Sequence, residues 1–487
     1  MINPDYYEIR KLAKKYKLIP ICKEIYADFT TPIELLRKIS QISNRYYLLE
    51  SVEGGEKWGR YSFLGFDPIA HIKCKNGKIT IEENEEKVKI IYSLKPLEVV
   101  RTYLSGYKAP RIAGFPPFTG GLVGYFAYSM TKYFEPSLKL RSSDFNDFDL
   151  MLFNKVIVYD HLKQKISIIA NIKSDRLEEN YIKAITEIDN INSIIIEQTP
   201  LPKVQIKSTP RFTCNVTKEE YCNMVNETKE YIKNGEVYQA VISRRFETEY
   251  KDSLINAYRV LRTTNPSPYM VFMENGDVQL ISTSPETLVR LQDGILRTFP
   301  IAGSRPRGKN SNEDKELERS LLEDEKELAE HNMLVDLARN DLGKVSKYSS
   351  VNVVNYKMIQ RYSKIMHITS EVQGCIREDK DALDAIEALL PAGTLTGAPK
   401  IRACQIIEEL EKEPRGIYGG AIGYIDFSGN MDVCIAIRMA VKKNDRVYIQ
   451  AGGGIVADSI PEKEYQESEN KAKAVLEAII SAKEVDG

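Results

Sequence analysis

Short turns between runs of alternating apolar residues constrain this chain more than any other feature of its sequence. Asn76-Gly77 separates IAHIKCK from KITIEE, and Asn275-Gly276 interrupts MVFMENGDVQLIST. An Asn-Gly pair readily supplies the two positive φ angles of a two-residue hairpin turn. NKVIVYD and KISIIANI predict a further hairpin. Because these hairpins alternate with helical patterns without a regular βαβ order, we expect an α+β fold with largely antiparallel sheets.

The length of 487 residues exceeds what one simple core accommodates and predicts two or three domains. The stretch EQTPLPKVQIKSTPRF is rich in proline and is interpreted as a connector. We therefore expect an N-terminal unit over residues 1–200 and a second unit over residues 213–487. The first forty residues are expected to be helical, with a break at Pro20 and a new start at Thr31-Pro32.

Composition excludes several classes of function. A net charge of -1 offers no basic surface for nucleic acid or an anionic membrane, and no apolar run approaches the roughly 20 residues that span a bilayer. The N-terminus is polar rather than a signal peptide. Seven cysteines without a CxxC pair predict reduced thiols in the cytoplasm. With only four histidines there is no zinc motif, so a bound metal should be ligated by oxygen.

Two acidic helices predict a metal site. In DEKELAEHNMLVDLARND, Asp324 and Glu327 have the spacing of a capping box, and Glu327 and Glu330 leave one side of the helix. SIPEKEYQESENKAKA shows the same pattern, with Ser459 and Glu462 at the spacing of a capping box and Glu464 and Glu467 three residues apart. The two helices together supply four acids to the predicted site, namely Glu327, Glu330, Glu464 and Glu467. If the carboxylates meet, they repel one another unless a hard dication such as Mg²⁺ lies between them. The alternative is that Glu327 only caps its helix and the other acids are solvated.

Three further features have both a functional and a structural interpretation. Gly452, Gly453 and Gly454 separate a strand from the second acidic helix, where a turn exposes backbone amides to a carboxylate or simply requires glycine. Arg438 either grips a carboxylate or lies on a strand surface. His367 precedes a strand and is equally compatible with a structural role.

Many separate motifs, in one order, carry a family resemblance. They are GEVYQAVISRRF, NPSPYMVF, STSPE, PIAGSRPRG, AEHNMLVDLARNDLG, MHITSEVQG, PAGTLTGAPKIRA, YGGAIGY and QAGGGIVADSIPEKEY, with LLES at Leu48–Ser51 extending the likeness toward the N-terminus. Together they closely resemble the chorismate-utilising enzymes, in particular the large subunits of anthranilate synthase. The resemblance implies a layered α/β sandwich with a site between sheets. It also implies Mg²⁺-dependent conversion of chorismate and ammonia to anthranilate and pyruvate, the first committed step of tryptophan biosynthesis.

The resemblance assigns roles residue by residue. It implies that Glu330 and Glu467 bind magnesium, with Glu327 and Glu464 beside them, directly or through water. The chorismate-binding positions that it implies are Gly303, Ser304, Tyr418, Arg438, Gly452, Gly453, Gly454 and Lys471. Glu286 matches the acid that protonates the departing ring hydroxyl, and His367 matches the histidine of pyruvate elimination. The implied site for tryptophan as feedback inhibitor comprises Ser51, Pro268, Tyr269 and Met270.

Two positions distinguish members of the family. Gln239 stands where the water-using relatives carry a lysine that deprotonates water, and neutral ammonia needs no such base. Ala302 stands where aminodeoxychorismate synthases commonly carry a lysine. Because the chain has no GxCxG nucleophile elbow, ammonia must be free or delivered by a partner subunit. The resemblance implies that this partner is a glutamine amidotransferase subunit, in a heterodimer or heterotetramer. Two alternatives remain open, namely component I of aminodeoxychorismate synthase and a tryptophan-binding module without catalysis.

Overall fold

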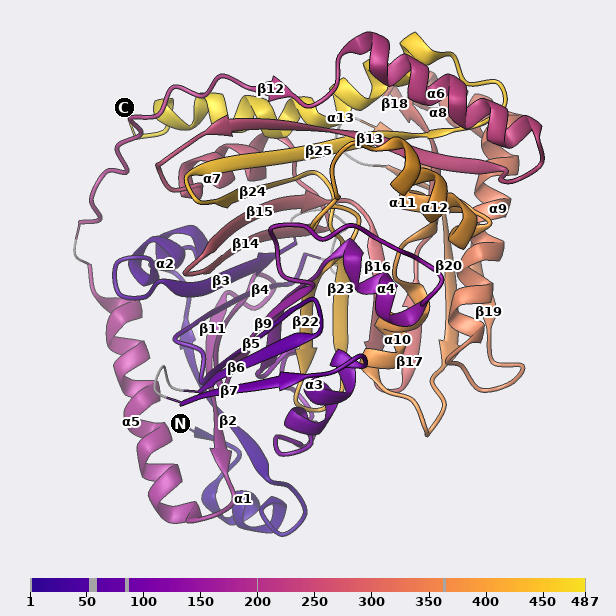
Figure 1. Ribbon diagram of the computed structural model, residues 1–487. Coiled ribbons are helices and arrows are strands. Elements are labelled where there is room, and N and C mark those ends of the chain that lie inside the picture. Colours follow the sequence, from indigo (N-terminus) through magenta and orange to yellow (C-terminus); the bar gives the residue numbers. More distant parts are fainter. Residues whose placement is uncertain (1, 52–58, 84–86, 199, 362–364, 487) are drawn as a thin grey trace.

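The computed structural model describes residues 2–51, 59–83, 87–198, 200–361 and 365–486 (Figure 1). These residues form two large sheets in which every pairing of neighbouring strands is antiparallel. The first sheet has 13 strands among the described residues, in the order β1 (Ile2–Asn3), β2 (Leu18–Tyr26), β11 (Lys165–Lys173), β10 (Lys155–Asp160), β4 (Tyr61–Phe66), β3 (Arg45–Glu50), β14 (Tyr269–Asn275), β15 (Val278–Ser284), β24 (Met439–Lys443), β25 (Arg446–Ile455), β13 (Gln239–Glu249) and β12 (Thr213–Cys214), with β21 (Gly397–Ala398) beside β13.

The second sheet has 12 strands within the same described ranges. Their order is β18 (Ile301–Pro306), β20 (Ile365–Cys375), β17 (Ile295–Thr298), β16 (Thr287–Gln292), β23 (Met431–Ile435), β22 (Ala421–Asp426), β8 (Gly121–Phe126), β9 (Phe148–Phe153), β5 (Ala70–Lys75), β6 (Lys78–Glu83) and β7 (Lys87–Tyr92), with β19 (Asn352–Arg361) beside β20. The α+β class and the largely antiparallel sheets predicted from the sequence are confirmed.

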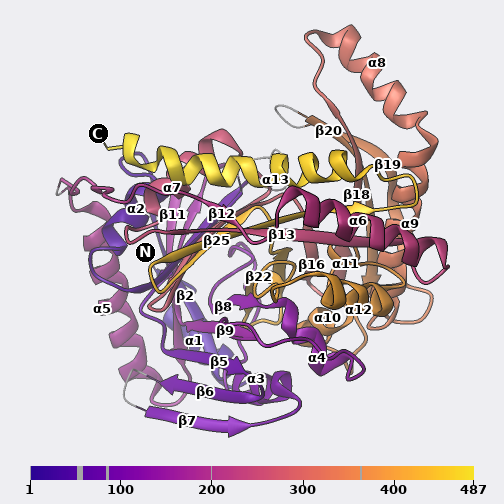
Figure 2. The same cartoon turned by 45° about the horizontal axis from the view of Figure 1, so that its top comes forward.

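Helices cover the outer faces of both sheets (Figures 1 and 2). Their bounds are α1 (Tyr6–Leu12), α2 (Pro32–Ile39), α3 (Pro96–Leu104), α4 (Thr131–Phe134), α5 (Leu177–Ile196), α6 (Lys218–Lys233), α7 (Ile255–Thr264), α8 (Ser311–Leu322), α9 (Glu325–Gly343), α10 (Ala382–Leu389), α11 (Gly393–Thr396), α12 (Lys400–Leu410) and α13 (Pro461–Ser481). The long α13 crosses the first sheet at the top of Figure 2. None of the helices in the described part of the chain is both long and apolar enough to span a bilayer.

Three large hydrophobic clusters give the molecule its layers. One lies between the first sheet and helices α2, α5, α7 and α13, and another lies between the second sheet and α3, α9 and α10. The third joins the inner faces of the two sheets, where Tyr47 of β3 packs edge-on against Phe153 of β9 with ring centroids 4.8 Å apart. Burial of apolar side chains on both faces of each sheet therefore produces the layered sandwich that was expected.

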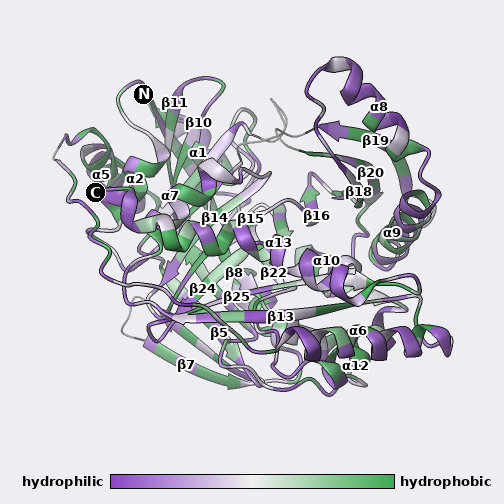
Figure 3. Cartoon of the chain, turned by 90° about the horizontal axis from the view of Figure 1, so that it is seen from above, coloured by the Kyte–Doolittle hydropathy of each residue, from purple (hydrophilic) through white to green (hydrophobic). Residues whose placement is uncertain are grey.

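Both sheets take strands from both halves of the sequence. Strand β3 pairs with β14, and β8 pairs with β22. The two segments predicted from the sequence, 1–200 and 213–487, therefore share both sheets, and residues 201–212 run between them without a helix or strand. Seen from above, α8, α9 and strands β18, β19 and β20 gather on one side of the molecule (Figure 3).

The hairpin turns formed as predicted, whereas one prediction for the N-terminus was wrong. Asn76 and Gly77 have φ angles of +50° and +76° and join β5 to β6. Thr31 caps α2, with Pro32 as its first residue. Residues 18–26, however, form strand β2 rather than a helix. Pro20 fits there because the neighbouring β1 pairs only with Cys22 and Lys23, so that no strand beyond it requires a Pro20 N–H.

Candidate active site and regulatory pocket

Helix α9 carries the first pair of acids. The Asp324 carboxylate accepts hydrogen bonds from the backbone N–H groups of Lys326 and Glu327, so Asp324 caps the helix as predicted, but the Glu327 side chain does not complete the predicted capping box. The Glu327 carboxylate turns toward β18, where a Cβ added to Gly303 would lie 3.1 Å from its Oε2. Burial raises the pKa of Glu327, and the charge of the neighbouring Glu330 raises it further. The i, i+3 spacing has therefore placed two repelling carboxylates on one side of α9.

Helix α13 carries the second pair, although it begins differently from the prediction. Its first residue is Pro461, and the Ser459 hydroxyl accepts from the Val456 N–H instead of capping the helix. The predicted Ser459–Glu462 capping box is therefore wrong, because the proline supplies the helix start without a side-chain cap. A Cβ added to Gly453 would lie 3.1 Å from Oε2 of Glu464 and 3.9 Å from Oε1 of Glu467, so both carboxylates face the same strand.

The charges of both acidic helices act on the carboxyl group of Glu464. Burial raises the pKa of Glu464 on α13, and Glu467 contributes to this rise. The charge of Lys326 on α9 acts in the opposite direction and lowers the same pKa. Each helix thus brings a pair of acids with unfavourable mutual charge to one region of the molecule.

Gly452, Gly453 and Gly454 lie within strand β25 and not in a turn, which corrects the prediction. They pair with β13 in extended conformation. Glycine is required at these positions because atoms of β13 lie very close to the backbone of β25. A Cβ on Gly452 would lie 2.2 Å from the Ile242 carbonyl oxygen, and one on Gly454 would lie 2.1 Å from Nε2 of Gln239. The buried Gln239 side chain therefore lies directly over Gly454.

Two cations face this glycine strand. The Nζ of Lys471 donates to the Gly452 carbonyl oxygen at 3.1 Å and lies 2.7 Å from Oε1 of Glu467. The half-buried Arg438 donates from Nη1 to the Lys471 carbonyl oxygen at 3.2 Å, and desolvation lowers its pKa. Tyr418 is buried beside Gly452, and this burial raises the pKa of its hydroxyl to about 12. Arg438 and Lys471 thus concentrate positive charge beside unhindered backbone, an arrangement suited to an anion.

Glu286 is a half-buried acid that is partly protonated near neutral pH. It immediately precedes β16, and desolvation raises its pKa to about 7 against the opposing effects of a Thr394 hydrogen bond and the Lys471 charge. The Thr394 hydroxyl donates to its Oε1 at 2.9 Å. The environment is therefore the one expected of a carboxylic acid that donates a proton.

His367 lies on β20 opposite Ser304 of β18, beside the bulge formed by Gly303. Its Nδ1 lies 3.1 Å from the Gly303 carbonyl oxygen, which can only accept, so Nδ1 carries the hydrogen. Burial lowers the pKa of His367, and the charge of Arg438 lowers it further. His367 is consequently a neutral imidazole that borders the same region as Glu327 and Arg438.

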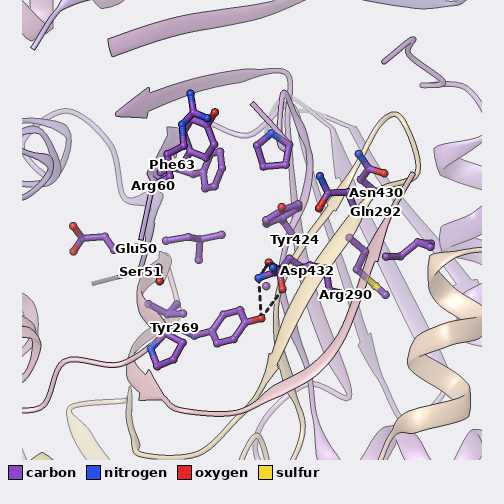
Figure 4. Close-up of a pocket in the computed structure, with 18 of the residues that line it drawn as sticks. Glu50, Ser51, Arg60, Phe63, Tyr269, Arg290, Gln292, Tyr424, Asn430 and Asp432 are labelled. Carbon is purple, nitrogen blue, oxygen red and sulfur yellow. Dashed lines mark hydrogen bonds and ion pairs between the residues drawn. The ribbon is translucent and has the colours of Figure 1, made fainter. Parts of the chain in front are cut away.

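A separate cavity of about 350 Å³ contains all four residues predicted to bind tryptophan (Figure 4). Strand pairing explains their convergence, because Glu50 of β3 lies opposite Met270 of β14. The Ser51 hydroxyl is buried and has no hydrogen-bond partner among the described residues. The cavity is lined by Leu49, Glu50, Ser51, Arg60, Tyr61, Phe63, Arg111, Phe115, Pro117, Pro268, Tyr269, Met270, Val271, Arg290, Leu291, Gln292, Ile422, Gly423, Tyr424, Asn430, Met431 and Asp432.

Comparisons with known proteins identify the family. The model of the chorismate binding enzyme family matches residues 44–477. The chain is 44% identical to anthranilate synthase component 1 of Acetivibrio thermocellus over 100% of both chains, and 45% identical to that of Aquifex aeolicus over 99% of both. The chain belongs to the chorismate-binding enzyme family, in its anthranilate synthase component 1 branch. A crystal structure of anthranilate synthase component I from Streptococcus pneumoniae has a TM-score of 0.78 at 35% identity, and the match covers 93% of this chain and 98% of that one.

The acids of this chorismate-binding enzyme fit the metal that the family implies. Within the described ranges no three metal-ligating side chains are close enough to form a metal centre by themselves. Magnesium is commonly held by one or two carboxylates together with water and substrate oxygens, so a three-residue cluster is not required. Burial raises the pKa values of Glu327 and Glu464, and the neighbouring charges of Glu330 and Glu467 raise them further, an effect that a dication would offset.

Sequence reasoning missed several residues of the site. Thr394 comes from PAGTLTGAPK, a motif whose residues received no role, and only the fold brings its hydroxyl to Glu286. Asp432 and Arg290, which form an ion pair of 2.7 Å in the wall of the large cavity, were also missed. Little in the sequence indicated them, because single charged residues are common in strands. Their place in a cavity wall becomes clear only once the strand pairing is known.

Proposed function

We propose that this chain is the aminase subunit of an anthranilate synthase and converts chorismate and ammonia to anthranilate and pyruvate with Mg²⁺. The names of its full-length relatives support this activity. The observation that carries the proposal is the half-buried Glu286, with its pKa of about 7, in the same site as the Arg438 and Lys471 cations. A protonated acid among cations suits a dianionic substrate that loses a hydroxyl group.

Binding of chorismate is assigned to the two cationic side chains beside the glycine strand. Arg438 and Lys471 receive the carboxylates of chorismate, and Gly452–Gly454 let the ring approach the backbone of β25. Tyr418 bounds the site beside Gly452. Glu330 and Glu467 would hold Mg²⁺, with Glu327 and Glu464 as direct or water-mediated ligands. When bound, the cation polarises the ring carboxylate as a Lewis acid and orients the substrate.

Two residues then move protons. Glu286 gives its carboxyl proton to the ring hydroxyl, which leaves as water, while ammonia forms its bond to the ring carbon next to the one that carries the ring carboxylate. His367 bonds through Nδ1 to Gly303 and so carries its lone pair on Nε2, the form suited to proton transfer during elimination of pyruvate. Loss of the ring proton and of the enolpyruvyl group makes the ring aromatic.

Ammonia rather than water is assigned as the nucleophile. Gln239 offers an amide over Gly454, which cannot remove a proton from water at neutral pH. Ammonia is supplied by a glutamine amidotransferase subunit in a heterodimer or heterotetramer, a proposal supported by the name component 1 in the relatives. The seven cysteines are free thiols, in keeping with action in the cytoplasm.

The large cavity is assigned to tryptophan as a feedback inhibitor. Its volume of about 350 Å³ lies in the range of small-molecule pockets, and its walls combine aromatic and methionine side chains with charged groups. Phe63 and Met270 would contact the indole ring, while the buried Ser51 hydroxyl would bond to a polar group of the amino acid.

Anthranilate fluorescence tests the proposal directly. The purified chain is incubated with chorismate, Mg²⁺ and an ammonium salt at mildly alkaline pH, and turnover should stop with EDTA and return with added Mg²⁺. Glu286→Gln should lower kcat by roughly 10²–10⁴-fold. A product that retains the enolpyruvyl group would indicate aminodeoxychorismate synthesis instead. Tryptophan binding without any turnover would leave only a regulatory module.

A further inference from the structure

Arg415 and Glu411 form a buried ion pair to which the proposed chemistry assigns no role. Their side chains are 1% and 4% exposed. The Arg415 guanidinium donates to both Glu411 oxygens, at 2.9 Å from Nε and 2.6 Å from Nη2. A buried pair of this kind gains little net stability over apolar side chains, because both charges lose their hydration. Its other contacts therefore suggest a further purpose.

Arg415 also donates hydrogen bonds to two backbone carbonyl groups near the site. Nη1 donates to the Leu395 carbonyl oxygen at 2.5 Å, and Nη2 donates to that of Val241 at 2.7 Å. Leu395 belongs to α11, a single turn whose last carbonyl groups lack helical N–H partners, so Arg415 caps this turn. Thr394, the preceding residue of α11, donates its hydroxyl to Glu286.

Glu411 connects the ion pair to the strand next to the glycine strand. Its Oε1 accepts from the Ser243 N–H at 2.8 Å and from the Ser243 hydroxyl at 2.7 Å. Ser243 pairs with Gly452 of β25, the strand that faces Lys471. The Arg415 guanidinium lies 5.7 Å from the ring centroid of Tyr418 as well. One ion pair thus bonds to the residue after Thr394, to β13 beside the glycine strand, and lies near the ring of Tyr418.

We propose that Arg415, held by Glu411, is a positioning residue that fixes the Thr394 hydroxyl on the catalytic acid Glu286 by capping α11. This inference rests on the proposed function, in which Glu286 donates a proton. Arg415 itself touches no reacting atom. The fork of its guanidinium is needed because a lysine ammonium cannot bond in one plane to Glu411, Leu395 and Val241 together.

The inference predicts a change in pH dependence. The Thr394 hydrogen bond lowers the pKa of Glu286, so its loss should move the alkaline limb of kcat/KM for chorismate to higher pH. The charged groups around Glu286 are Lys471 of α13, which also lowers its pKa, and Asp341 of α9, which lines the same small cavity and is paired with Lys400. Lys471 and Asp341 make no hydrogen bond or ion pair with Arg415 among the described residues. A change at Arg415 should therefore shift the pKa of Glu286 through Thr394.

Arg415→Lys and Thr394→Val test this prediction, with neutral ammonia saturating at every pH. Each variant should move the limb upward by about one pH unit and lower kcat about tenfold, with little change in KM for chorismate. The double variant should shift the limb no further, because both changes remove the same hydrogen bond. Arg402→Lys makes the same substitution in a partly exposed ion pair of α12 and should behave as the parent enzyme.

An unchanged limb in Arg415→Lys, or additive shifts in the double variant, would overturn the positioning role. If Arg415→Lys does not fold, Glu411→Gln/Arg415→Met removes both buried charges together while an amide oxygen remains for Ser243, and the same upward shift is expected. An unshifted limb in that variant also overturns the inference. Failure of the proposed function is a separate result, in which the parent chain forms no anthranilate under any of these conditions.

Discussion

The hydroxyl groups of Tyr269 and Thr287 lie 2.9 Å apart and join the wall of the large cavity to the strand that begins beside Glu286. Tyr269 also donates to Asp432 at 2.8 Å, and Asp432 pairs with Arg290 farther along the same strand β16. Figure 4 shows Tyr269, Arg290 and Asp432 meeting on one side of the cavity. A ligand that displaces Tyr269 or Asp432 therefore acts on the strand adjoining Glu286, the proposed catalytic acid.

Thr287→Val should weaken inhibition by tryptophan without entering the cavity. The substitution preserves shape and removes the hydroxyl that contacts Tyr269, so tryptophan should still bind with its Kd changed by less than about threefold. The concentration that halves activity should rise about tenfold, as expected when a coupling of about 1.4 kcal/mol is lost. Calorimetry measures binding, and anthranilate fluorescence measures inhibition. Equal losses in both measurements would contradict coupling through this hydrogen bond.

Ser51→Phe should abolish inhibition by tryptophan while the uninhibited rate changes little. The Ser51 side chain borders the cavity, and a phenyl ring there would occupy the volume that the indole needs. The titration of activity with tryptophan should become flat over the range that inhibits the parent enzyme. Ser193→Phe on the exposed side of α5 is the matched control and should leave inhibition intact. Unaltered inhibition in Ser51→Phe would remove tryptophan from this cavity.

Local signals allowed the sequence to predict much of the fold. The hairpin turn at Asn76-Gly77 needs only two residues with positive φ, and the cap at Asp324 needs only its own helix. The i, i+3 spacing of Glu464 and Glu467 likewise specifies one helix face whatever surrounds it. The family motifs then indicated which of these local features belong to one site.

Long-range strand pairing could not be predicted in the same way. The sequence does not reveal that β3 lies beside β14, although this pairing brings Ser51 to the Tyr269 segment. The extended conformation of Gly452–Gly454 follows from their close approach to β13, a contact between segments far apart in the chain. The cap of Arg415 on α11 was missed for the same reason, since nothing local pairs a guanidinium with that carbonyl group.

Glu330→Gln and Glu467→Gln should each lower activity about a hundredfold through loss of Mg²⁺. A neutral amide keeps the shape of each side chain but removes the charge that attracts the cation. Calorimetric titration with Mg²⁺ in the presence of chorismate should show affinity weakened to the same extent. Glu477→Gln on the exposed face of α13 is the control and should match the parent enzyme. Parent-like affinity in both site variants would remove these acids from the metal site.

His367→Ala should permit amination and stall the elimination of pyruvate. The neutral imidazole, whose pKa burial lowers, is the group available for proton transfer beside Gly303. Overall anthranilate formation should fall by roughly 10²–10⁴-fold, while chorismate continues to disappear. Chromatography of quenched samples should reveal an amino-enolpyruvyl compound that accumulates with time. Equal slowing of chorismate loss and anthranilate formation, without that compound, would assign His367 to an earlier step.

The pH dependence of turnover should report the protonation of Glu286. Burial raises the pKa of Glu286 to about 7, so the acid form predominates below that pH and is lost as the pH rises through it. With neutral ammonia saturating throughout, kcat/KM for chorismate should therefore be level at acidic pH and fall tenfold per unit well above the pKa. Glu286→Gln should lack this limb as well as most of the activity. An alkaline limb that persists in the glutamine variant would assign the proton to another group, and Lys471 would then be the next residue to replace.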